Sequence, residues 1–145
     1  MSIIPGIETR LPVFFSEGVS KGRISLNQFA ALTATNHAKL YGLYPRKGSI
    51  GIGFDADLTL WDPNRRETIR QANLYHGADY TPWEGFSVTG WPVMTLTRGE
   101  VVAEDVGVQW TRPDLAAAVA ALVVDDDAVL VGEVVDLRRP EVGRA

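Results

Sequence analysis

The feature that most constrains the fold is the stretch at residues 48–63, GSIGIGFDADLTLWDP. Its three glycines allow the backbone to turn and to adopt positive φ angles. Asp55 and Asp57 follow, and their short carboxylates can accept hydrogen bonds from nearby backbone amides. Residues 58–61 then alternate apolar and polar side chains as a half-buried strand does, and Pro63 is expected to end that strand. The stretch therefore predicts a strand between two turns.

Composition and charge place the chain among ordinary globular proteins. Its 145 residues, 46% of them hydrophobic, are enough for one domain with a substantial core. The net charge of −4 argues against nucleic acid and acidic membrane surfaces as partners. The chain has no cysteine, which excludes disulfides, thiolate metal sites and cysteine nucleophiles. Because no apolar run approaches the roughly 20 residues that span a bilayer, and no signal peptide is recognisable, we expect a cytoplasmic protein.

The region before the glycine-rich stretch is expected to be helical. Ser25 and Gln28 form a capping-box pattern, and apolar residues follow at helical spacing. Residues 35–36 are expected to interrupt this helix, and Gly42 to end a second short one. Pro12, in an apolar run that could begin a helix or a strand, would suit the first turn of a helix. Gly18 and Gly22 are expected to bound a short loop.

The region after the stretch is expected to be antiparallel β-structure. Two strands are predicted at residues 86–89 and 92–98, separated by Gly90. A tight turn at Gly99 then leads into an alternating apolar strand at residues 101–104. With the helices before it, this region predicts an α+β fold.

The tail differs from the rest in composition. An alanine-rich segment at residues 115–124 favours a helix, and residues 125–127 form an acidic, solvated turn. The valine-rich residues 128–135 favour a strand.

Residue chemistry alone supports no complete active site. His37 and His76 are far apart in the sequence and form no metal-binding motif. Asp55 and Asp57 are interpreted as residues that cap backbone amides. No G-x-S-x-G elbow is present, and the glycine-rich stretch lacks the lysine and the helix of a phosphate loop. We therefore predict no catalytic and no metal-ligating residue in this chain.

Several motifs together resemble one enzyme family. G-x-x-x-G-x-D-A-D is similar to the signature of the small β-sandwich domain that accompanies the metal-dependent amidohydrolase barrel. PGIETRLP at residues 5–12 resembles the loop after the last barrel strand of hydantoinases, dihydropyrimidinases, allantoinases and dihydroorotases. GRISL at residues 22–26 and TNHAKLYGLYPRKG at residues 35–48 are similar to the following helices and linker. DYTPWEG at residues 79–85, followed by GWPV at residues 90–93, points to hydantoinase or dihydropyrimidinase.

The resemblance implies a fold, a domain division and a substrate loop. Residues 1–47 would be the last loop and terminal helices of an amidohydrolase TIM barrel, and residues 48–108 part of the composite β-sandwich domain. Residues 109–145 would be a divergent C-terminal tail. Ser2 and Gly6 would be substrate-binding loop positions, since the family has a substrate contact just before its proline-glycine pair.

The resemblance also implies a chemistry that this chain cannot perform alone. Complete family members hydrolyse cyclic amides with two divalent metals, usually zinc. The ligands are an H-x-H pair, a carboxylated lysine, two further histidines and an aspartate, all of which lie upstream of the PGIETRLP loop. The chain alone is therefore expected to bind no zinc and to be inactive.

Three interpretations remain open. The chain is the C-terminal portion of a cyclic amidohydrolase, a complementing subunit of a split enzyme, or a non-catalytic interaction module. An upstream reading frame with the missing ligands would favour the split enzyme. The apolar helix face of Leu26, Phe29 and Leu32 is expected to be partly uncovered, so self-association or association with an N-terminal barrel fragment is expected.

Overall fold

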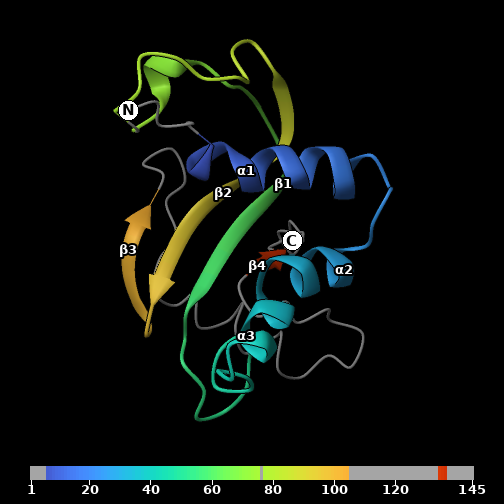
Figure 1. Ribbon diagram of the computed structural model, residues 1–145, viewed down its shortest axis with the longest axis vertical. Helices are drawn as coiled ribbons and strands as arrows, with labels where there is room; N and C mark the ends of the chain where they lie inside the picture. Colours follow the sequence, from blue (N-terminus) through green and yellow to red (C-terminus); the bar gives the residue numbers. More distant parts are fainter. Residues whose placement is uncertain (1–5, 76, 105–133, 137–145) are drawn as a thin grey trace, which may run out of the picture.

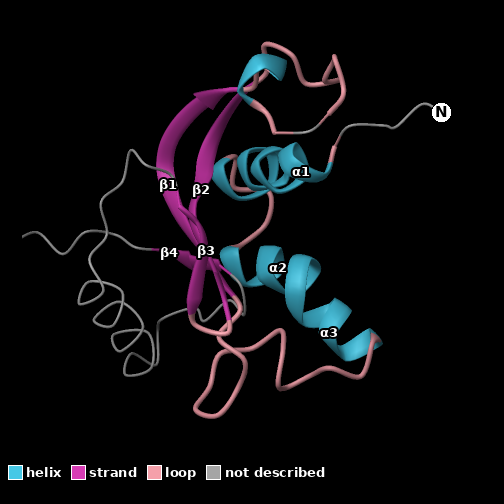
Figure 2. Ribbon diagram, turned by 90° about the vertical axis from the view of Figure 1, so that its left-hand side faces the viewer, coloured by secondary structure: helices cyan, strands magenta, loops and turns pink. Residues whose placement is uncertain are grey.

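The computed structural model describes residues 6–75, 77–104 and 134–136. These residues form an α+β unit in which the helices lie on one face of a sheet (Figure 1). Figure 2 shows the two layers edge-on, with α1 and the run from α2 to α3 on the same side of the strands. The α+β class predicted from the sequence is confirmed.

The first helix is longer than the sequence suggested. α1 spans Ile7–Phe14 and continues directly as a π-helical segment, η1, over Phe15–Ser20. Pro12 lies inside α1 and not in its first turn, and Gly18 is buried within η1 and not in a loop. One face of this helical run is buried against the sheet, and that burial outweighs the cost of a proline and a glycine inside a helix, about 3 and about 1 kcal/mol.

The second helical run is continuous, although two helices were predicted. α2 (Leu26–Ala30), η2 (Ala31–Thr35) and α3 (Asn36–Leu40) follow one another without a break. The predicted interruption at residues 35–36 is wrong because the Thr35 hydroxyl donates to the carbonyl of Gly48, 2.7 Å away and outside the helix. It therefore does not compete for the backbone groups of its own helix.

Both ends of this run are capped as predicted. The Ser25 hydroxyl accepts a hydrogen bond from the Gln28 N–H (3.2 Å), and the Gln28 side chain accepts one from the Ser25 N–H (2.9 Å). At the other end Gly42 has a φ angle of +68°, and the Leu43 N–H donates to the carbonyl of Ala38 at 2.8 Å. This is the geometry of a Schellman motif, which glycine favours.

The sheet has the strand order β3-β2-β1-β4 among the described residues. β1 (Leu58–Thr68) pairs antiparallel with β2 (Ser87–Thr97), and β2 pairs antiparallel with β3 (Glu100–Glu104). The antiparallel region predicted from the sequence is thus confirmed. β4 (Val134–Asp136) pairs with β1 in parallel, which the sequence did not indicate.

β1 continues past Pro63, where the sequence predicted its end. The pairing with β2 changes register after Asp62, whose carboxylate accepts hydrogen bonds from the N–H groups of Asn64 (2.9 Å) and Arg65 (3.2 Å). Pro63 therefore lies in a bulge, where its missing N–H costs no ladder hydrogen bond and the strand can resume beyond it.

β2 is a single strand, although two were predicted on either side of Gly90. Gly90 has a φ angle of +94°, and a Cβ atom there would lie only 2.1 Å from Cδ1 of Phe15. The glycine therefore marks the place where an aromatic ring presses on the strand, and it does not interrupt the strand.

The predicted turn between β2 and β3 is confirmed. Arg98 and Gly99 both have positive φ angles, 51° and 81°, as a two-residue type I′ turn requires. The side chains of β3 are exposed on both faces in spite of their alternating pattern, and Val102 is 60% exposed.

A long loop connects β1 to β2 and covers the start of α1. It contains a short 3-10 helix, η3, over Gln71–Asn73. Its base is closed where the Ile69 N–H donates to the carbonyl of Phe86 at 2.9 Å, and the Glu8 carboxylate of α1 accepts from the Tyr75 N–H at 2.9 Å. The loop is thereby fixed against the helix.

One aromatic cluster joins the helices to the sheet. Phe15 of η1 stacks on Trp61 of β1 with ring centroids 4.8 Å apart, and Phe29 of α2 meets the edge of Trp61 at 5.7 Å. All three rings are at most 1% exposed. Phe29 is therefore not part of an uncovered helix face as expected, whereas Leu32 is 49% exposed.

A second cluster lies between α1 and the loop after β1. Its buried members are Val13, Ile69 and Val88, with Leu74, Trp83, Phe86 and Trp91 packed around them.

Several predictions fall outside the described residues. They concern the helix at residues 115–124, most of the strand at residues 128–135, and the positions Ser2 and His76. The helices that the structure does describe are all too short or too polar to cross a bilayer.

Gly90→Ala is expected to destabilise the fold by several kcal/mol. The positive φ angle costs a residue with a side chain about 1–2 kcal/mol, and the clash with Phe15 adds about 1–3 kcal/mol. Gly53→Ala is the matched control, because Gly53 also has a positive φ angle (+86°) but no atom within 4 Å of the added Cβ. Denaturant unfolding measures both variants, and equal losses would contradict the close approach of Phe15.

Candidate functional site

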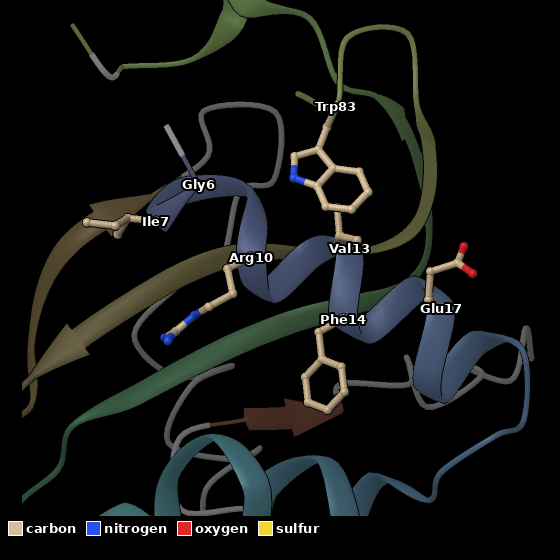
Figure 3. A pocket seen from close by; sticks show the side chains of 7 residues that line it. All are labelled: Gly6, Ile7, Arg10, Val13, Phe14, Glu17 and Trp83. Atoms are coloured by element: carbon tan, nitrogen blue, oxygen red, sulfur yellow. The ribbon is translucent and has the colours of Figure 1, made fainter. Parts of the chain in front are cut away.

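A hollow of the described surface lies beside α1. This α1 cavity has a volume of about 750 Å³ and is shown in Figure 3; it is lined by Gly6, Ile7, Arg10, Val13, Phe14, Glu17 and Trp83. The helix residues among them recur every three or four positions, as residues along a helix surface do. Trp83 comes from the loop before β2 and reaches toward α1, while Arg10 and Phe14 project from the other side of the helix.

The α1 cavity is lined mainly by apolar side chains and has few groups that could act in catalysis. Its one carboxylate, Glu17, already binds the ammonium of Lys21 (2.6 Å) and the guanidinium of Arg23 (3.4 Å). Arg10 is an exposed cation, and no serine, histidine or lysine is among the lining residues. The described part of the cavity can therefore hold an apolar group, but it contains no nucleophile and no free carboxylate base.

Of the two predicted substrate-binding positions, the structure places one. Gly6 lines the α1 cavity, and its carbonyl accepts a hydrogen bond from the Arg10 N–H at 2.9 Å, whereas Ser2 lies outside the described residues. Sequence reasoning did not single out Arg10, Phe14 or Trp83. Arg10 and Phe14 are four positions apart, so helical spacing places them on the same helix face. That inference requires the apolar run around them to be assigned to a helix first.

The two aspartates of the glycine-rich stretch form a second charged group. Asp57 accepts hydrogen bonds from the Lys47 ammonium through Oδ2 and from the Arg98 N–H through Oδ1, the latter at 2.9 Å. Asp55 lies 3.1 Å from the same ammonium and 3.6 Å from the guanidinium nitrogen Nε of Arg46. We call these residues the Asp57 network; it connects the linker after α3 to the turn between β2 and β3.

The Asp57 network changes the acidity of its members. The hydrogen bond from Lys47, followed by the one from the Arg98 N–H, holds the pKa of Asp57 below its ordinary value of 3.8. In turn the hydrogen bonds to Asp57 and then Asp55 raise the pKa of Lys47 above its ordinary value of 10.5. Both groups are thereby held in their charged forms, which suits a structural ion pair better than an acid or base that exchanges protons near neutrality.

The glycine at the start of the stretch connects the helices to this network. Gly48 is buried with a φ angle of +75°, and a Cβ there would lie 2.6 Å from the Cβ of Ala38 and 3.0 Å from the Cα of Thr35. The structure thus supports the interpretation of residues 48–57 as a backbone-fixing element.

The described residues do not fit a metal centre. Within residues 6–75, 77–104 and 134–136, no group of three or more His, Asp or Glu side chains converges. His37 is an exposed residue of α3, and Asp55 and Asp57 are engaged by Lys47. No hydrolytic step through a metal can be derived from these residues.

Comparison with known proteins gives a consistent result. The Amidohydrolase family matches this chain over residues 6–102. The D-hydantoinase of Geobacillus stearothermophilus is 50% identical over 101 residues, which are 70% of this chain and 21% of that protein.

Solved structures agree with the sequence match. The D-hydantoinase (dihydropyrimidinase) from Thermus sp. superimposes with a TM-score of 0.69 at 40% identity, covering 77% of this chain and 24% of that one. The L-hydantoinase (dihydropyrimidinase) from Arthrobacter aurescens gives a TM-score of 0.65 at 41% identity, covering 68% and 22%. The chain thus spans between a fifth and a quarter of the length of these relatives.

Asp57→Asn is expected to lower the free energy of unfolding at pH 7 by about 1–2 kcal/mol, the range for charge-assisted hydrogen bonds at a partly exposed site. Because the pKa of Asp57 is lower in the folded chain, its stabilisation is present above pH 3.8 and is lost as pH falls through the folded pKa. The contribution of Lys47, whose pKa is raised, is present below pH 10.5 and is lost at higher pH.

Urea unfolding between pH 3 and pH 7 measures this dependence. The difference between the wild type and Asp57→Asn should decrease as the pH falls below 3.8. Asp79→Asn, at an exposed aspartate, is the control and should parallel the wild type. A constant difference between Asp57→Asn and wild type across this range would contradict the assigned role.

Proposed function

Because the chain belongs to the amidohydrolase family, we propose that it is the C-terminal portion of a metal-dependent hydrolase of cyclic amides. The substrates of the complete enzyme are hydantoins or dihydropyrimidines, as the names of the relatives suggest. The observation that carries the proposal is the continuous match over residues 6–102, which includes both the helices and the sheet. Relatives named for D- and for L-hydantoins both match, so the proposal leaves the stereochemistry open.

In this proposal residues 1–47 are the last loop and helices of a TIM barrel, and residues 48–108 are part of its β-sandwich domain. In the complete enzyme, the residues that bind the two zinc ions belong to the remaining part of the barrel, because the donor set described above does not fit a metal. This chain contributes framework and Gly6, which directly precedes α1.

The α1 cavity is the proposed contact with that remaining part. Ile7 is 93% exposed at the start of α1, and Phe14 and Trp83 line the same cavity. Apolar side chains left exposed at a helix start favour burial against a partner. The partner proposed here is the N-terminal barrel polypeptide.

A complementing subunit of a split enzyme is the second candidate. It is favoured by the aromatic cluster, since Phe15, Phe29 and Trp61 are buried without any further polypeptide. A chain with its own closed core can fold before it meets its partner.

An activity assay tests the proposal. The purified chain should release no product from hydantoin or dihydrouracil and should hold no stoichiometric zinc after gel filtration. Together with the polypeptide that carries the H-x-H, lysine and aspartate ligands of a hydantoinase barrel, it should gain both ring-opening activity and bound metal. Hydrolysis by this chain alone, or a stable complex without activity on either ring, would overturn the proposal.

Two exposed isoleucines supply matched variants for the contact. Ile7→Asp should weaken association with the barrel polypeptide at least about tenfold, since a charge would enter an apolar contact. Ile52→Asp, at a residue 96% exposed in a loop away from the cavity, should leave association unchanged. If both variants bind the barrel polypeptide equally well, the α1 cavity is not the contact surface.

A further inference from the structure

One side chain attaches the long loop between β1 and β2 to the start of α1. The Glu8 carboxylate accepts a hydrogen bond from the Tyr75 N–H at 2.9 Å, across 67 residues of sequence. Glu8 lies in the first turn of α1, where the N–H groups at a helix start favour a carboxylate. Figure 2 shows the loop beside this end of the helix. The tip of the loop is thereby fixed to α1.

The loop also has supports of its own. The Gln71 N–H donates to the Glu84 carboxylate at 2.7 Å and so closes the loop on itself. Leu74 packs against the second cluster, whereas its neighbour Tyr75 is 98% exposed. Leu74 and Glu8 thus hold the backbone that presents the Tyr75 side chain to solvent.

A second exposed apolar side chain lies at the same end of α1. Ile7 is 93% exposed and directly precedes Glu8 in the helix. A single exposed apolar residue is ordinary on a protein surface. Here, however, a carboxylate between them fixes the segments of Ile7 and Tyr75 close together. We call these two residues the loop-tip surface; because Ile7 also lines the α1 cavity, the two surfaces are continuous.

The chain connection in the relatives indicates which polypeptide covers the loop-tip surface. The family match begins at residue 6, directly before Ile7, and the chain spans 21% of the D-hydantoinase that it matches. In a complete hydantoinase, any polypeptide that precedes the matched part is therefore joined at the end of α1 that carries this surface. Apolar side chains at such a junction favour burial against the part that is joined there.

We propose that Glu8 is a positioning residue, which holds the Tyr75 N–H so that Ile7 and Tyr75 together form a contact surface for the barrel polypeptide. The contact of the α1 cavity is thereby extended onto the loop between β1 and β2. This inference rests on the proposed function, because the occupant is the same barrel polypeptide. Glu8 acts through Tyr75, whose N–H engages its carboxylate, and does not itself contact the partner.

Hydrogen exchange of the Tyr75 amide, measured by NMR on the full chain alone, tests the positioning. Glu8→Ala removes the acceptor and should speed this exchange at least about tenfold. Glu8→Gln retains an acceptor oxygen and should preserve the wild-type rate. Glu17→Ala is the matched control, since Glu17 lies on the same helical run but binds Lys21 and Arg23, and it should leave the Tyr75 amide unchanged.

Association with the barrel polypeptide tests the contact surface. Tyr75→Ala should weaken association at least about tenfold, as truncation of a buried interface tyrosine can. Tyr41→Ala, at a residue 71% exposed at the end of α3, should leave association unchanged. Glu8→Ala should weaken association of the otherwise natural chain, but it should cause no further loss in a Tyr75→Ala background, because the effects of residues that act through one another do not add.

The possible failures are distinguishable. If Glu8→Ala leaves exchange of the Tyr75 amide unchanged, the carboxylate does not position the loop. If the wild type binds the barrel polypeptide and Tyr75→Ala binds equally well, the loop-tip surface is refuted while the proposed function is retained. Additive losses from Glu8→Ala and Tyr75→Ala would show that Glu8 contacts the partner directly, against the proposal. A wild type that does not associate at all would overturn the proposed function, and the contact surface with it.

Discussion

The rest of the structure depends on the contact between Phe15 and Trp61. Phe15 stacks on Trp61 and thereby joins η1 to β1, and Phe29, which meets the edge of Trp61, joins α2 to the same strand. All three rings are buried. The contact is possible only because Gly90 has no side chain where the Phe15 ring meets β2. Burial of three aromatic rings supplies more stabilisation than any single surface ion pair in the molecule.

The glycine-rich stretch fixes the same two layers at a second place. Gly48 fits closely against α3, while Asp57 binds Lys47 and the N–H of Arg98 in the turn between β2 and β3. The motif that resembles the amidohydrolase signature is therefore a structural element in this chain. This explains how a segment can match hydantoinases closely and yet contain no convergent metal ligands among its described residues.

Local sequence patterns predicted the features that depend on a few neighbouring residues. The capping box of Ser25, the helix end at Gly42 and the turn at Gly99 each follow from one or two side chains or a positive φ angle. The errors arose where tertiary packing decides. Pro63 alone predicts a strand end and Gly90 alone a break, because neither the bulge nor the contact with the Phe15 ring can be inferred from neighbouring residues. The α1 cavity was missed for the same reason, since Trp83 joins it from a distant loop.

The central claim is that helices and sheet form one cooperative unit through the aromatic cluster. Amide resonances of residues 26–40 and 87–97, followed through urea unfolding of the full chain, test it most directly. The account predicts a single shared midpoint for both sets, and an equal decrease of both midpoints in Phe29→Ala, which removes a buried ring worth about 3–5 kcal/mol. Separate midpoints, or a Phe29→Ala decrease confined to the helices, would contradict it.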